Sequence, residues 1–359
     1  MAGSQRPNFD WASSTDITKL IALLGLGGLG GFAAAALTLP LPFLLGGLAT
    51  TLLLASLANR RGITLPFPQF LRRFFVGIIG TMIGGAFSPD LIRVLPELAI
   101  TAIAVAVFVP VAMAIGYVIC RVIGKYDRVT ALYSALPGGL IDAVEIGTAS
   151  GGNAQVLTLS HLMRIFAVVF SVPLIYWAWS GGPVGSSAGE SFDPGYWTYA
   201  GLALALIITL VGLAMGPLLR LPAAHLLGPM ALSAILHGAG LVETASPEWL
   251  LLLAQLMVGV GLASQFSGSD GPGLARIVLT MIVMVSTLLL VSAGFALVLT
   301  RVSPLGFDAL FLSFAPGGVT EMGLIALSLS VSPVVVVAHH MVRIFVVVVV
   351  AAVTARRIT

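Results

Sequence analysis

SALPGGLIDA, residues 134–143, and SFAPGGVTEM, residues 313–322, share a Pro-Gly-Gly core and lie 179 residues apart. SHLMRIFAVV at 160–169 and HHMVRIFVVV at 339–348 have the same offset. Matches in Leu, Val and Ala mean little in an apolar chain. Shared Pro, Gly, acid, His and Arg in one order at one offset indicate an internal duplication. We therefore expect two homologous halves with equivalent elements.

The composition places both halves in a membrane. Of 359 residues, 58% are hydrophobic and only 9% are charged, whereas about a quarter of the residues in soluble domains are charged. This excludes a soluble enzyme, a secreted domain or a free DNA-binding protein as the whole chain. The lone cysteine, Cys120, excludes an intrachain disulfide and a multi-cysteine metal cluster. A formal charge of +3 does not indicate a nucleic-acid partner.

Ten charge-poor runs approach the length of about 20 residues that a helix needs to cross a bilayer. The predicted spans are 20–38, 42–59, 74–89, 97–120, 155–178, 197–217, 223–242, 249–267, 277–300 and 333–354. Residues 180–195 form a polar linker flanked by Trp and Tyr, which favour a membrane interface. The expected organisation is an N-terminal cytoplasmic segment 1–19, a first membrane repeat 20–179, the linker 180–195 and a second repeat 196–359.

The Pro-Gly-Gly segments, 129–150 and 308–329, decide whether the halves are parallel or inverted. If both dip into the membrane and return, each half crosses five times and the second half is inverted. This arrangement places most Lys and Arg residues on the cytoplasmic side, and the six-crossing alternative does so less well. We therefore predict an all-α polytopic membrane protein of two inverted repeats. It has about ten transmembrane helices, two re-entrant or broken helices, and both termini in the cytoplasm.

The Pro-Gly-Gly motifs are the first candidate binding elements. Proline removes a backbone N–H and disfavours helix before it, and paired glycines allow a ligand close to the backbone. Discontinuous helices in matching positions of inverted halves indicate a transporter's central site. The alternative is a proline kink in a packed helix. The candidate ligand-binding residues here are Pro137, Gly138, Gly139, Pro316, Gly317, Gly318 and Thr320.

Acidic residues follow each motif. Asp142 and Glu145 lie one helical turn apart in the first copy, and Glu321 repeats the position of Asp142. Charge at membrane depth is costly and commonly functional, so these acids are candidates for coupling to H⁺ or Na⁺. Because they stand near helix starts, a purely capping role stays open.

Two arginines in the middle of spans are the strongest single candidates. Arg164 and Arg343 belong to the repeated Arg-Ile-Phe and have no basic neighbour. Each must pair or face water. Either it forms a salt bridge to Asp142 or Glu321, or it binds a carboxylate, sulfonate or phosphonate. The candidate proton-relay residues His161 and His340 precede them by three residues, on the same helical face, although a hydrogen-bonded core histidine is the alternative.

The repeated motifs resemble the duplicated integral-membrane AbrB family, over roughly residues 20–354. Members are often labelled ammonia monooxygenase or regulator. The second motif is similar to the family pattern. The first departs from it, since Ile141 stands where a small hydroxyl residue is usual and Asp142 replaces Glu. The resemblance implies a bacterial cytoplasmic (inner) membrane protein whose two motif copies are not equivalent.

These observations lead to three functional hypotheses. The first is a secondary transporter of a small organic anion bound at the two Pro-Gly-Gly motifs. It has no enzymatic step, no resident metal or other cofactor, and the lipid bilayer and a second copy of the chain as further partners. The second is a membrane sensor that uses the same pocket to affect gene expression. The third and weakest is a membrane monooxygenase, because the five histidines form no cluster with metal-ligand spacing.

Overall fold

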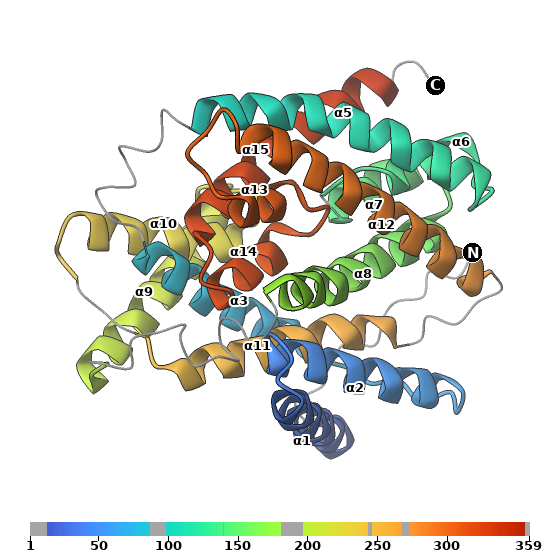
Figure 1. The fold of residues 1–359 in the computed structure, drawn as a ribbon. Helices are drawn as coiled ribbons and strands as arrows, with labels where there is room; N and C mark the ends of the chain where they lie inside the picture. Colours follow the sequence, from blue (N-terminus) through green and yellow to red (C-terminus); the bar gives the residue numbers. More distant parts are fainter. Residues whose placement is uncertain are drawn as a thin grey trace. The chain divides into compact units, whose positions relative to one another are not determined.

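The computed structural model describes residues 13–86, 98–138, 140–180, 197–242, 246–267 and 273–355, and these residues form helices, turns and loops without a strand (Figure 1). The helices from the first half of the chain are α1 (Ser14–Ala36), α2 (Pro42–Asn59), α3 (Gln69–Gly85), α5 (Leu98–Val122), α6 (Arg128–Ser134), α7 (Leu140–Ala149) and α8 (Ala154–Ser180). Those from the second half are α9 (Tyr199–Leu218), α10 (Ala224–Gly238), α11 (Glu248–Ala263), α12 (Leu274–Leu299), α13 (Phe307–Phe314), α14 (Val319–Ser328) and α15 (Pro333–Ala355), with a 3₁₀ turn at Ser264–Phe266.

Eight of the described helices are long and apolar enough to cross a membrane, and the protein is an all-α, multi-pass membrane protein. Each of the ten predicted spans coincides with a helix, but α3 has 17 residues and α10 has 15. These two lie at or below the short end of the range for a spanning helix. Helix α1 begins at Ser14, earlier than expected, because the Ser13 hydroxyl caps the Asp16 N–H. Of the linker predicted at 180–195, only the backbone of Ser180 is described.

The duplication extends to helix ends and turns. Helices α7 and α14 begin 179 residues apart, as the motifs do, and α2 and α10 begin 182 apart. The connections before α2 and α10 both contain left-handed residues at matching places. Thr38 and Leu41 have φ of 53° and 46°, and Arg220 and Ala223 have φ of 52° and 46°. The two halves therefore fold alike, including two uncommon backbone conformations.

The compact units of the structure do not coincide with the two sequence repeats. One unit, which we call the outer unit only as a label, contains α1–α3 and α9–α11. The other, called the motif unit, contains α5–α7, α12, α13, α15 and most of α8 and α14. Each half of the chain thus supplies its first three helices to the outer unit and the following helices to the motif unit.

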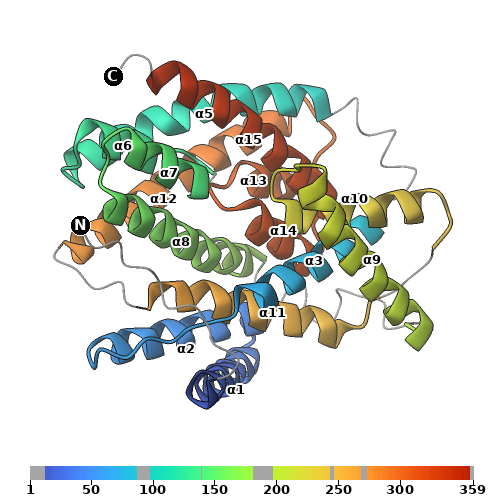
Figure 2. The ribbon, with the colours of Figure 1, turned by 180° about the vertical axis from the view of Figure 1, so that it is seen from behind.

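Close glycine contacts build the outer unit. Gly30 in α1 meets Gly46 in α2, and the equivalent Gly212 and Gly228 bring α9 against α10. The halves then exchange partners: α3 packs on α9 and α10, and α11 packs on α1 and α2 (Figure 2). Small residues allow this approach of helix backbones, which is how helices associate in membranes.

The same exchange of partners occurs in the motif unit. Helix α5 contacts α15 of the other half, and α5 and its own equivalent α12 contact each other. Helix α13 packs against α12 and α15. Phe108, Phe295 and Phe314, from α5, α12 and α13, form a cluster with ring centroids 5.2–5.6 Å apart. This cluster fixes the end of α13, directly before the second Pro-Gly-Gly motif.

Candidate functional site

Both Pro-Gly-Gly motifs lie in the motif unit, and each separates two short helices. In the first copy α6 ends and α7 begins on either side of the motif, and in the second copy α13 and α14 do so. The backbone at the break is alike in both. The Gly138 N–H donates to the Leu136 carbonyl at 3.0 Å, and the Gly317 N–H donates to the Ala315 carbonyl at 2.9 Å. The prediction of broken helices is therefore correct.

The two arginines hold the carbonyl ends of the first short helices. Arg164 Nη1 donates to the Leu136 carbonyl, and Arg343 Nη1 donates to the Ala315 carbonyl at 2.6 Å. Arg343 Nη2 also donates to the Gly317 carbonyl. The last carbonyls of a helix lack intrahelical partners and carry a partial negative charge. The guanidiniums therefore stabilise these helix ends, a role that the sequence analysis did not consider.

The histidines bind the same short helices one turn earlier. His161 Nε2 lies 3.0 Å from the Tyr133 carbonyl oxygen, and His340 Nε2 lies 3.1 Å from the Leu312 carbonyl oxygen. A carbonyl only accepts, so the Nε2 atoms carry the protons. Both imidazoles are fully buried. These contacts match the alternative of a hydrogen-bonded core histidine, and a proton relay stays a prediction.

His339 has a different role from its neighbour. Its Nδ1 donates to the Val335 carbonyl at 2.8 Å, and its Nε2 lies 2.8 Å from the Thr101 hydroxyl, which joins α15 to α5. The equivalent position in the first half is Ser160, whose hydroxyl lies 3.1 Å from that of Tyr126. The two copies therefore use different side chains at this position.

Buried nitrogen atoms without a hydrogen-bond partner accompany both breaks. Within the described residues these atoms are Nε of Arg164 and Arg343 and Nδ1 of His161 and His340. An unsatisfied buried polar group costs about 1–3 kcal/mol. The same atoms are orphaned in both copies, which indicates a feature of the site rather than a local packing defect.

The buried charges leave an excess of positive charge. Among the described side chains, the charged groups classed as buried are Arg164, Arg343 and Glu321, with exposed fractions of 2%, 1% and 4%. The charge of Arg164 acts on Arg343, so the two guanidiniums repel each other. Water or protein charge must compensate such groups, or a bound anion must do so. The site therefore has the electrostatics of an anion site.

The acidic residues occupy three different situations. Glu321 lies at the third position of α14, and its carboxylate folds back over Gly318, where a β-carbon would overlap Oε2. A glutamate that reaches back to the start of its own helix is a capping arrangement. Glu145 is exposed on α7. Asp142 belongs to α7, but its side chain lies outside the described residues, as does Gly139.

The glycines also distinguish the copies. Gly138 has φ of 133°, a left-handed value that favours glycine, whereas Gly317 does not have a positive φ. Gly318 needs to be glycine for another reason, since the Glu321 carboxylate takes the space of a side chain. Gly318 and Thr320, at the start of α14, are half-buried and accessible. The sequence-based expectation of two unequal copies agrees with these differences.

The described residues contain no group of three His, Cys, Asp or Glu side chains able to hold a metal ion. The functional partners that sequence reasoning missed are backbone atoms, the carbonyls of Leu136 and Ala315. One signal was present: each arginine follows its carbonyl by 28 residues in both halves.

Comparisons with known proteins give the family. A family model described as "Transition state regulatory protein AbrB" matches residues 51–359. "Putative regulator AbrB" of Escherichia coli (strain K12) is 24% identical over 316 residues, covering 86% of this chain and 88% of that protein. "Uncharacterized protein YhjN" of Bacillus subtilis (strain 168) is 31% identical over 257 residues, covering 66% of this chain and 65% of that protein. The alignment thus spans just under two thirds of the length of the Bacillus protein.

The family match covers most of the chain, so the chain belongs to the AbrB family.

Proposed function

We propose that this AbrB-family membrane protein is a secondary transporter of a small organic anion, which binds between the two broken helices. The observation that carries the proposal is the pair of buried, mutually repelling guanidiniums at the two helix breaks. A carboxylate, sulfonate or phosphonate would relieve this repulsion and satisfy orphaned donors. Transport of this kind requires no enzymatic step and no resident cofactor.

Arg164 is the better placed of the two arginines for contact with the anion. It makes one hydrogen bond to the described residues, through Nη1, whereas Arg343 uses both Nη1 and Nη2. The Nε–Nη2 edge of Arg164 therefore has no partner among those residues, and it has the geometry that binds carboxylates with two parallel hydrogen bonds. We assign Arg164 to anion binding and Arg343 mainly to holding the second break.

Glu321 is the proposed coupling group. Its carboxylate lies at the start of α14, where an anion would also be attracted. Protonation of Glu321 would remove this competing negative charge, so that H⁺ and the anion would bind together. With the N-terminus inside, as the positive charges predict, this describes a transporter of the cytoplasmic membrane driven by a proton gradient.

The first test is ligand binding by the purified protein. A thermal-shift screen in detergent would cover small carboxylates, sulfonates, phosphonates and, as a contrast, amines, across pH and with or without Na⁺. A ligand of the folded state raises the melting temperature by mass action. An anion hit followed by flux into proteoliposomes would support transport. Silence of the whole panel, or a hit among amines alone, would contradict the proposal.

The matched variants are Arg164→Lys and Arg276→Lys. Lysine at 164 keeps the positive charge near the Leu136 carbonyl but loses the two-pronged edge. A charge-assisted hydrogen bond is worth about 1.5–3 kcal/mol, so anion affinity should fall about 10- to 100-fold. Arg276 is exposed at the start of α12 and serves as the control. Equal affinity in Arg164→Lys and the wild type would remove Arg164 from the site.

The sensor is the alternative function, favoured by the regulator name of the Escherichia coli relative. It uses the same pocket, and affects gene expression through a partner protein. Flux separates the two functions, because a sensor binds the anion and shifts its melting temperature without moving it across a liposome membrane. Binding without flux, under a proton gradient of either direction, would favour the sensor.

A further inference from the structure

A surface hollow in the outer unit lies apart from both broken helices. It has a volume of about 310 Å³, at the low end of the range for ligand pockets. Its lining comes from α1, α2 and the segment after α2. The side chains that the argument uses are Leu23, Leu26, Leu54 and Leu57 on the walls and Lys19 and Arg61 as cations.

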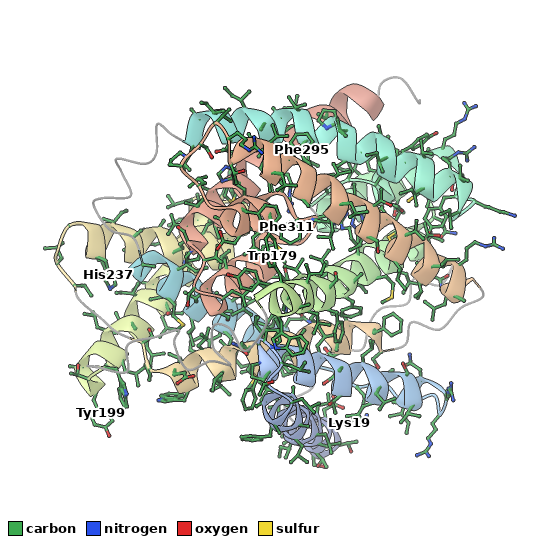
Figure 3. All side chains as sticks on the ribbon, in the orientation of Figure 1. Lys19, Trp179, Tyr199, His237, Phe295 and Phe311 are labelled. Carbon is green, nitrogen blue, oxygen red and sulfur yellow. The ribbon has the colours of Figure 1, made fainter. Side chains whose placement is uncertain are left out.

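The cations stand together at one end of the hollow. Lys19 lies in the second turn of α1, and Arg61 follows the last residue of α2. The two helices contact each other and are joined by a short turn, so these positions share one end of the hairpin. Figure 3 shows Lys19 on α1. The nearest acid, Asp16, lies 3.8 Å from Lys19, which leaves a positive balance at this end.

The leucines continue from this end into the apolar part of the hairpin. Leu26 follows Lys19 by seven residues, which is about 10 Å along a helix. Leu26 and Leu57 have exposed fractions of 41% and 49%, so they present an open apolar surface. A charged end with an apolar continuation matches a phospholipid, whose headgroup is anionic and whose chain is hydrocarbon.

The equivalent positions in the second half carry no such cations. At the offset of 182 residues, Lys19 corresponds to Gly201 and Arg61 corresponds to Glu243. In inverted repeats, these positions face opposite sides of the membrane. The cytoplasmic leaflet holds most of the anionic lipid, and basic pockets between helices on that side bind anionic headgroups. The charge difference between the halves therefore follows the expected lipid difference.

We propose that this hollow binds an anionic phospholipid of the cytoplasmic leaflet, with its headgroup between Lys19 and Arg61 and one acyl chain along the leucines. The proposal is independent of the transported substrate. It also does not rest on Arg164 or Arg343, so its test can fail while the proposed transport function stands.

The test measures lipid binding by the purified full chain in detergent. Native mass spectrometry would follow titrations with phosphatidylglycerol and with phosphatidylcholine. We expect the wild type to prefer phosphatidylglycerol. Lys19→Ala combined with Arg61→Ala should lower phosphatidylglycerol affinity about 30-fold, the contribution expected from two cations near an anionic surface. Phosphatidylcholine binding should change little, since it depends on the apolar walls.

Two further variants make the result specific. Arg60→Ala removes an adjacent exposed arginine that does not line the hollow, and it should stay within about two-fold of the wild type. Leu57→Trp should fill the hollow and weaken both lipids. Should the double variant not fold, Arg61→Gln alone, at an exposed position after α2, should give about a five-fold loss.

An unchanged phosphatidylglycerol preference in Lys19→Ala/Arg61→Ala would overturn the proposal, as would an equal loss in Arg60→Ala. Displacement of the lipid by equimolar glycerol 3-phosphate would also overturn it, since a site for a soluble phosphate needs no leucine walls.

Discussion

Replacing each buried arginine by methionine tests whether the helix breaks are held by the contacts described above. Arg164→Met removes one hydrogen bond to a carbonyl, and Arg343→Met removes two. A hydrogen bond from a charged donor contributes about 1.5–3 kcal/mol. Both side chains are almost completely buried, so the free energy recovered by not burying a guanidinium is similar in the two variants. The loss of their mutual repulsion is common to both.

These shared effects cancel in the comparison. Arg343→Met is therefore expected to lower the free energy of unfolding by about 1.5–3 kcal/mol more than Arg164→Met. The assay is equilibrium unfolding in mixed micelles with increasing SDS, with the exposed Arg276→Met as the control. The double variant should cost less than the sum of the single variants, because the second substitution no longer removes repulsion. An Arg164→Met variant as destabilised as Arg343→Met would refute the assignment of their roles.

Three other predictions concern packing, capping and topology. Gly80→Ala should destabilise by about 1–3 kcal/mol, because its β-carbon would overlap the Leu226 carbonyl, while Gly25→Ala, with open space around it, should stabilise by up to about 1 kcal/mol through helix propensity; thermal unfolding measures both. Burial raises the pKa of Asp127, but hydrogen bonds from Thr130 outweigh burial and place that pKa below its ordinary value, so stability should fall as pH drops below about 4, and a pH titration of unfolding should lose this step in Asp127→Ala. In a cysteine-free background, Arg60→Cys should react with impermeant maleimide only from the cytoplasmic side and a cysteine at 241 only from the outside; labelling from one side would contradict inversion.

The sequence predicted the breaks well because they depend on residues with unusual backbone properties. Proline and glycine at 137–139 and 316–318 mark a helix interruption wherever they occur in an apolar run. The duplication then confirmed each copy by the other. The helix positions followed for the same reason, since a span is visible as a run without charge.

The partners of the arginines were not predictable in the same way. A salt bridge joins two charged side chains, and the sequence displays both. A carbonyl at the end of a short helix has no residue type, because Leu136 and Ala315 differ and both are ordinary apolar residues. Only the constant spacing of 28 residues to Arg164 and Arg343 marked the contact.

The division into two units was hidden for a related reason. Repeats show which helices are equivalent, but not which helices of the two copies exchange partners. Gly80 and its equivalent Gly259 carried that information, since they meet the Leu226 and Leu44 carbonyls of the other half. In the sequence they are two glycines among 41. Their role depends on a backbone approach that only the fold provides.

The differences between the two copies bear on how a duplicated fold would transport in a defined way. Identical inverted halves would give two equivalent half-sites. Here the second copy commits its arginine to two carbonyls and covers its helix start with Glu321, whereas Arg164 in the first copy keeps one edge without a described partner. On the proposed function, the first copy binds the anion and the second senses the proton. Glu321→Gln should then remove the pH dependence of uptake while anion binding persists, and Arg164→Lys should do the reverse; equal effects of both variants on both readouts would show that the copies do not divide these tasks.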